Sequence, residues 1–110
     1  LLRIKERVLE FKLQFYLATH QYEEGLAYIQ TEKATVDLVT KESTAFRVVI
    51  LYYNLAAIYL SKMSFDIADD HLQKVLYHPS VREYEYVYSQ THVMRPTLGI
   101  LVDLVRTQSY

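Results

Sequence analysis

The apolar residues between positions 51 and 79 recur at helical spacing on both sides of one short break at Met63-Ser64. Before the break, the residues three or four positions apart are Leu51, Leu55, Ile58 and Tyr59. After it, they are Phe65, Ala68, Leu72, Val75 and Leu76. Residues at these spacings share one face of an α-helix. The pattern therefore predicts two antiparallel helices joined by a tight turn.

Local signals predict the ends of the second of these helices. The hydroxyl of Ser64 can accept from a free amide of the following turn, so we expect it to be the N-cap of a helix that starts near Phe65. Asp66 in the first turn favours the positive end of the helix dipole. Pro79 ends the helix.

A partial copy of this hairpin lies a constant 43 residues earlier in the sequence. The corresponding pairs are Tyr16 and Tyr59, Leu17 and Leu60, Tyr22 and Phe65, Gly25 and Ala68, Ile29 and Leu72, and Gln30 and Gln73. We expect hairpins at about residues 1–41 and 43–79 in a single domain. The second helix of the first hairpin is extended through residues 31–40, and Ser43 caps the helix that starts near Thr44.

The first 19 residues predict a helix that is apolar over more than half its circumference. Beside the stripe of Leu2, Leu9, Leu13, Tyr16 and Leu17 stand Ile4, Val8, Phe11 and Phe15. Such a helix needs cover on two sides.

The last segment, residues 80–110, predicts an incomplete third hairpin. Ser80 and Glu83 fit a capping box at the start of a fifth helix. Pro96 removes a backbone donor, so we expect a kink near residues 93–95 or two helices abutting there. Truncation of this hairpin leaves an apolar strip on its helix, which invites self-association.

The central hairpin resembles the tetratricopeptide repeat, a helix-turn-helix unit of about 34 residues. The matching residues are Tyr52, Leu55, Ala56, Tyr59, Phe65, Ala68, Leu72, Val75 and Pro79. Two departures are Met63, where the family usually has glycine, and Pro79, which comes early. The resemblance implies an all-α fold of about five helices, in which antiparallel hairpins stack as an α-solenoid.

Composition argues against several classes of protein. The chain has no cysteine, which excludes disulfides and thiolate chemistry and fits a cytoplasmic location. With 12 basic and 13 acidic residues we expect no basic stripe and no nucleic-acid partner. No run approaches the roughly 18 apolar residues of a membrane span, so we expect no membrane partner. Because the sequence begins with Leu1, we take it as a fragment in which targeting signals can be missing.

Residues that carry chemistry are scattered. His71, His78 and Asp70 come nearest to a metal group, but we expect solvated surface histidines. Asp66 and Asp69 lack the spacing of a calcium loop. No glycine-rich phosphate loop or serine-nucleophile motif is present. We expect no enzyme activity, no catalytic residue, no metal and no cofactor.

In tetratricopeptide proteins, the first helices of successive repeats line a concave groove. Carried over by position, the resemblance implies these partner-binding residues: Arg7, Phe11, Gln14, Ile50, Tyr53, Asn54 and Ala57. Asn54 stands where the family often places an asparagine that bonds a ligand's backbone. A carboxylate clamp for chaperone tails is incomplete, since its cations reduce to Arg7 and Arg95.

Eleven tyrosines are an unusual number for a chain of 110 residues. Tyrosine is favoured at binding surfaces because it has a large apolar face and a polar tip. Tyr53 is the strongest candidate for a binding role. The tyrosines at 84, 86 and 88 either bind a partner or seal a seam between hairpins.

These patterns favour a non-catalytic scaffold that binds a protein or peptide segment in its concave face. One alternative is a peptide-sensing regulatory domain of a larger transcriptional regulator. Another is a structural subunit of a helical-repeat assembly.

Overall fold

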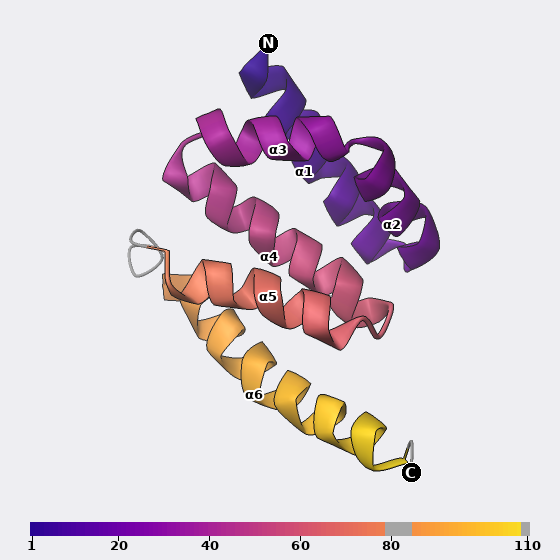
Figure 1. The fold of residues 1–110 in the computed structure, drawn as a ribbon. Helices are drawn as coiled ribbons and strands as arrows, with labels where there is room; N and C mark the ends of the chain where they lie inside the picture. Colours follow the sequence, from indigo (N-terminus) through magenta and orange to yellow (C-terminus); the bar gives the residue numbers. More distant parts are fainter. Residues whose placement is uncertain (79–84, 109–110) are drawn as a thin grey trace.

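The computed structural model describes residues 1–78 and 85–108, with the side chains of 1–78 and 89–100, and in these ranges it consists of helices joined by short turns (Figure 1). The helices are α1 Leu2–Ala18, α2 Tyr22–Thr31, α3 Lys33–Glu42, α4 Ala45–Ser61, α5 Phe65–Leu76 and α6 Glu85–Gln108. The described ranges contain no strand. The all-α fold class is therefore confirmed, and the described ranges contain six helices in place of about five.

The turns that follow α1 and α4 share one geometry. Each contains a left-handed residue, His20 at φ 57° and Met63 at φ 61°. In the second turn, the amide of Ser64 donates to the Tyr59 carbonyl at 2.8 Å and that of Met63 donates to Leu60 at 2.9 Å. The equivalent pair of bonds occurs 43 residues earlier. These bonds satisfy the last carbonyls of each helix and reverse the chain.

The apolar faces predicted for the central hairpin are buried between α4 and its neighbours. One cluster joins α1, α2, α3 and α4 and consists of Leu9, Leu13, Ile29, Val39, Leu51, Leu55 and Ile58. A second joins α4, α5 and α6 and consists of Ala56, Phe65, Ala68, Leu72 and Leu98. Helix α4 is thus the shared wall of two cores, which explains why it is apolar around most of its circumference.

Gly25 lies where α1, α2 and α4 meet. A Cβ built on it would lie 3.2 Å from Cβ of Tyr16 and 3.3 Å from Cδ1 of Ile58. Both distances are shorter than ordinary carbon contacts. The glycine is therefore explained by a close helix crossing.

The expectation of one extended helix through residues 31–40 is wrong. The helix ends at Thr31, and α3 starts at Lys33 in a new direction, crossing α1 (Figure 1). The change of direction at Glu32 buries Val39 against the α1–α4 core. Burial of this apolar face outweighs the one irregular residue at the bend.

Of the two predicted caps, only Ser64 stands at the N-cap position, and neither serine makes a side-chain cap bond. Ser64 precedes α5, yet its side chain makes no cap bond. The N-cap of α4 is Thr44, not Ser43. The hydroxyl of Ser43 donates instead to Oε2 of Glu6, 37 residues away. The Ser43 side chain therefore bonds to a carboxylate on α1 and not to an amide in the first turn of α4.

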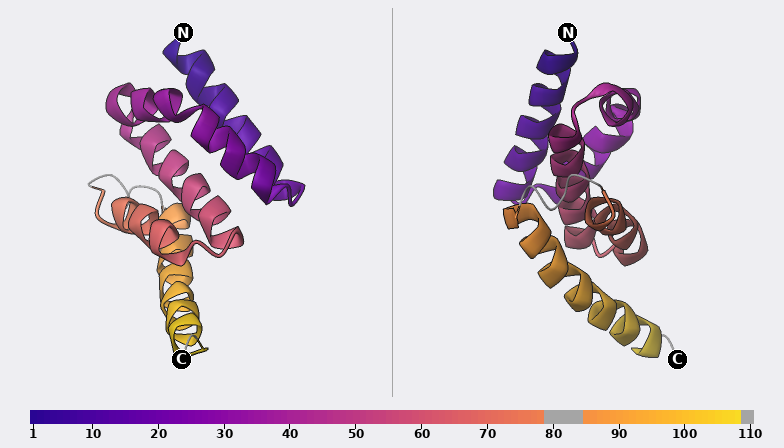
Figure 2. Two further views of the ribbon diagram at one scale, coloured as in Figure 1. Left: turned by 45° about the vertical axis from the view of Figure 1, so that its right-hand side comes forward. Right: turned by 90° about the vertical axis from the view of Figure 1, so that its left-hand side faces the viewer.

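Helix α6 is continuous through Pro96 and bends along its length (Figure 2). The expectation of two abutting helices is therefore wrong. Pro96 has no amide hydrogen, so one backbone hydrogen bond of the helix is missing there. At the next residue the hydroxyl of Thr97 donates to the Val93 carbonyl at 3.2 Å. Helix α5 ends at Leu76, three residues before Pro79, the residue predicted to end it. Pro79 itself, the capping box at Ser80 and Glu83, and Tyr84 lie outside the described residues.

In the right-hand view of Figure 2, α1 lies at the left edge of the molecule, α3 and α5 lie to its right, and α6 runs from below α1 toward the lower right. None of the described helices lies beyond the outer side of α1 in this view.

Candidate functional site

The outer side of α1 carries four apolar residues in one row, which we call the outer seam: Ile4, Val8, Phe11 and Phe15. All four are exposed, Phe11 to 71% and Phe15 to 47%. The opposite side of the same helix contributes Leu9 and Leu13 to the core. The sequence predicts that both apolar sides of this helix are packed against other elements. Within the described residues only the side with Leu9 and Leu13 is packed.

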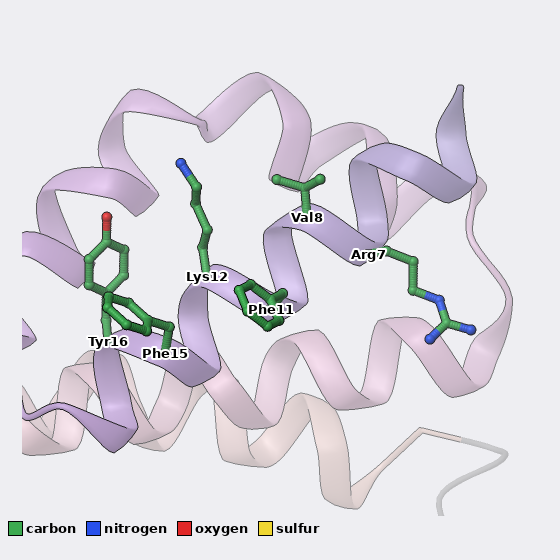
Figure 3. Close-up of a pocket in the computed structure, with 6 residues that line it drawn as sticks. All are labelled: Arg7, Val8, Phe11, Lys12, Phe15 and Tyr16. Carbon is green, nitrogen blue, oxygen red and sulfur yellow. The ribbon is translucent and has the colours of Figure 1, made fainter.

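The outer seam borders a hollow of about 440 Å³. Its lining residues all come from α1: Arg7, Val8, Phe11, Lys12, Phe15 and Tyr16 (Figure 3). In Figure 3 Lys12 and Val8 extend to one side of the helix, and Arg7 extends to the other. The floor of the hollow is therefore apolar, and a cation, Arg7 or Lys12, lies at each edge.

Tyr16 and Lys12, which line the hollow, contact Tyr28 of α2. The ring of Tyr16 lies 5.8 Å from that of Tyr28 and 5.7 Å from that of Phe15. Nζ of Lys12 lies 5.1 Å from the Tyr28 ring centre, over its face. Burial, with a smaller effect of Glu32, raises the pKa of Tyr28 above its ordinary value. Tyr28 is thus a neutral platform that positions Lys12.

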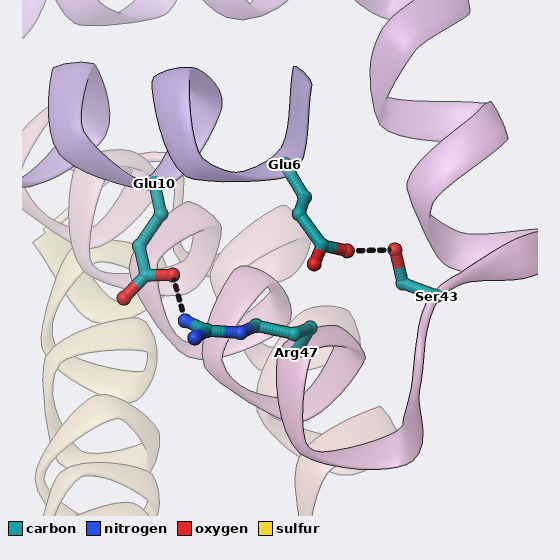
Figure 4. A network of polar contacts seen from close by, with 4 residues as sticks. All are labelled: Glu6, Glu10, Ser43 and Arg47. Atoms are coloured by element: carbon teal, nitrogen blue, oxygen red, sulfur yellow. Dashed lines mark hydrogen bonds and ion pairs between the residues drawn. The ribbon is translucent and has the colours of Figure 1, made fainter. Parts of the chain in front are cut away.

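The acids of α1 point inward. Oε2 of Glu10 lies 2.6 Å from Nη1 of Arg47 on α4, and Glu6 accepts the Ser43 hydroxyl (Figure 4). Both carboxylates are therefore partnered on the side of the helix that faces the rest of the fold. They fix α1 against α4 and do not neutralise the cations on the outer side.

The cations of α1 lie outward, at Arg3, Lys5, Arg7 and Lys12. All four are exposed, and the structure gives none of them an ion pair within the described residues. The expectation that the chain has no basic stripe overlooked this local concentration, because the overall net charge is −1. The outer side of α1 is positive although the chain is not.

The groove residues predicted from the tetratricopeptide resemblance divide between two environments. Arg7 and Phe11 line the hollow, and Gln14 is exposed beside it. On α4, Ile50 and Tyr53 are half-buried against Val49 and Val75, and Ala57 is also half-buried. The residues of α4 do not line the hollow on α1.

Asn54 is only 6% exposed, and its Nδ2 has no hydrogen-bond partner among the residues whose side chains are described. A buried amide without a partner loses its hydration without compensation. Because the Asn54 side chain is buried, little of its amide is accessible to the backbone of a bound peptide.

Within residues 1–78 and 89–100, whose side chains are described, no three metal-ligating side chains come together. Arg95, one of the cations of the incomplete carboxylate clamp, lies 3.2 Å from Oδ1 of Asp69, so both groups are engaged. Asp66 lies in the first turn of α5, as predicted.

His71 is half-buried, which corrects the expectation of a solvated surface histidine. Its ring stacks on Tyr59 with 5.5 Å between ring centres and lies 6.0 Å from Tyr52. Nδ1 lies 2.8 Å from the Ile67 carbonyl and donates to it. Burial lowers the pKa of His71 below its ordinary value, against a smaller opposing effect of this bond.

Sequence reasoning did not assign Val8, Lys12, Phe15 and Tyr16 to a site. Their apolar spacing was visible, but a helix with two apolar sides does not reveal which side the fold covers. The clustering of four cations in the first twelve residues was the second available signal.

Among the described residues there is no helix with the combined length and hydrophobicity of a membrane span. The chain matches no protein-family model, and searches of curated proteins and of solved structures give no significant match.

Proposed function

We propose that this chain is a non-catalytic helical scaffold that binds a protein or peptide segment on the face formed by α1 and α4, with its hairpins stacked as an α-solenoid. The observation that carries the proposal is the outer side of α1. It exposes four large apolar side chains in one row, whereas monomeric proteins rarely expose contiguous apolar patches without a role in binding.

Two further features support a binding surface. Phenylalanine, tyrosine and arginine are enriched at protein interfaces, and Phe11, Tyr53 and Arg7 belong to the proposed face. The face is also rigidly mounted, because the Glu10–Arg47 pair and the shared core hold α1 against α4. A rigid surface loses less conformational entropy on binding.

The test is selection of peptides from a random displayed library against the folded chain. Selected peptides are then titrated while backbone amide NMR shifts are recorded. We expect shifts to concentrate on α1 and α4. Phe11→Ala should weaken binding by at least about tenfold, and Tyr53→Ala should weaken it less because Tyr53 is partly packed against Val49.

A matched control is Tyr77→Ala, which removes an exposed tyrosine just after α5. It should leave binding unchanged. Shifts that concentrate on α5, or equal losses for Phe11→Ala and Tyr77→Ala, would refute the proposed face.

A further inference from the structure

The outer seam has the spacing of a coiled-coil core. Ile4, Val8, Phe11 and Phe15 follow one another at intervals of four, three and four residues. Alternation of three and four is the a/d pattern with which one helix packs against another along its length. The seam covers eleven helical steps, or about 16 Å. It therefore presents a docking strip for one helix of about three turns.

The hollow has the form that this packing requires. Val8, Phe11, Lys12 and Phe15 stand at positions i, i+3, i+4 and i+7, the four corners of the hole that receives a knob residue. In Figure 3 the ring of Phe11 lies in front of the α1 ribbon, with Val8 above it and Lys12 to its left. The six residues that line the hollow include all four of these corners.

Of the four positions that flank the seam, three carry a positive charge and one is neutral. Lys5 and Lys12 directly follow seam residues, and Arg7 and Gln14 directly precede them. In a coiled coil these are the e and g positions, whose charges select the partner. The acids of the helix, Glu6 and Glu10, are engaged on its inner side.

Charge at these positions argues against a second copy as the occupant. If two copies paired through the seam, in parallel or antiparallel orientation, the lysine and arginine side chains of one copy would lie against lysine and arginine side chains of the other. Like charges across such an interface are repulsive and disfavour the wrong partner. A helix with glutamate or aspartate beside its own apolar row reverses the sign of each contact.

We propose that the outer seam of α1 binds one amphipathic helix whose apolar row is flanked by acidic residues. The inference rests on the proposed function and names the class of partner that the α1 side of its face takes. Apolar side chains fill the hollow, and the flanking acids pair with Lys5, Arg7 and Lys12.

The probe is a synthetic three-heptad peptide with leucine at its a and d positions and glutamate at e and g. Its matched control has lysine at e and g. Binding to the full chain is measured by fluorescence anisotropy at low and high salt. The glutamate peptide should bind at least about tenfold more tightly than the lysine peptide, with an advantage that shrinks as salt rises. Equal affinities would overturn the proposal.

The variant Lys5→Glu/Arg7→Glu changes two exposed flanking residues outside the core and should reverse the preference in favour of the lysine peptide. Lys33→Glu/Lys41→Glu makes the same change of net charge on α3 and should retain the original preference. Circular dichroism and thermal unfolding check that both variants fold. Loss of preference in both variants would reduce the effect to net charge and overturn the proposal.

Other occupants have their own readouts. Flotation with vesicles of phosphatidylserine and phosphatidylcholine, abolished by Phe11→Asp in the absence of peptide binding, would assign the seam to a lipid surface and overturn the proposal. A dimer in analytical ultracentrifugation that Phe11→Asp dissociates would assign it to a second copy, with the same consequence. If library peptides bind the α1–α4 face while the glutamate peptide does not, this inference fails and the proposed function stands.

Discussion

Met63 holds a backbone conformation that glycine adopts with less strain. Its φ is 61°, in the left-handed region, and its side chain is 67% exposed. A side chain in this region is strained because Cβ approaches the following carbonyl. We predict that Met63→Gly raises the free energy of unfolding by about 0.5–1 kcal/mol, measured by urea denaturation.

Two control substitutions define the cause. Lys62→Gly should destabilise, because φ of Lys62 is −89° and glycine relieves no strain there, while it adds unfolded-state entropy and removes the ion pair with Glu23. His20→Gly should gain less than Met63→Gly, because it removes the 2.5 Å bond between His20 Nδ1 and the Tyr22 hydroxyl. Equal effects at positions 62 and 63 would rule out relief of strain.

Asn54 is a buried polar side chain whose Nδ2 has no hydrogen bond within residues 1–78 and 89–100. Because its Nδ2 is desolvated without a bond, replacement by an apolar residue of similar size removes a cost of about 1–3 kcal/mol. We predict that Asn54→Leu is neutral or stabilising in chemical denaturation, whereas Asn54→Asp, which buries a charge, is destabilising. A loss above about 1 kcal/mol in Asn54→Leu would show that the amide is satisfied in solution.

At the scale of the helices, local patterns predicted most of the elements and their turns. The break at Met63-Ser64, the apolar face from Phe65 to Val75 and the small residue at Gly25 depend on neighbours three or four positions away. Sequence carries such information directly.

The features that sequence did not predict depend on distant residues. The bend at Glu32 forms because Val39 reaches the core of α1 and α4, and Ser43 leaves its cap position because Glu6 is available. The candidate site was likewise predicted only in part. The apolar row on α1 could be identified from the sequence, but its exposure and the inward pairing of Glu10 with Arg47 depend on how the helices pack.

The Glu10–Arg47 pair fastens α1 to α4, and both groups are partly buried. Removal of Arg47 leaves a half-buried carboxylate without its cation. We predict that Arg47→Met costs about 1–2 kcal/mol of unfolding free energy and that a double-mutant cycle with Glu10→Gln gives a coupling of about 0.5–1 kcal/mol. The pair of Lys62 and Glu23 at 2.7 Å is more exposed and should show weaker coupling. Equal coupling in both pairs would contradict the role of burial.

For the molecule as a whole, the half-buried His71 links stability to pH. It contacts Tyr52 and Tyr59 of α4, and Lys74 and Asp70 of its own helix act on its charge. Burial holds its pKa in the folded protein below the ordinary value of about 6.5 that applies to the unfolded chain. Between these two values the unfolded chain binds more protons, so protonation favours unfolding.

The sign of the effect follows from the lowered pKa. Above pH of about 6.5 the histidine is neutral in both states and its contribution to stability is complete. As pH falls below that value, stability is lost until the folded-state pKa is passed, at no more than about 1.4 kcal/mol per pH unit. Urea denaturation between pH 7.5 and pH 5 should therefore show a decrease that is smaller in His71→Phe, which keeps a ring between the tyrosines and cannot titrate. Parallel pH profiles for the two proteins would mean that the α4–α5 contact is insensitive to the charge of His71.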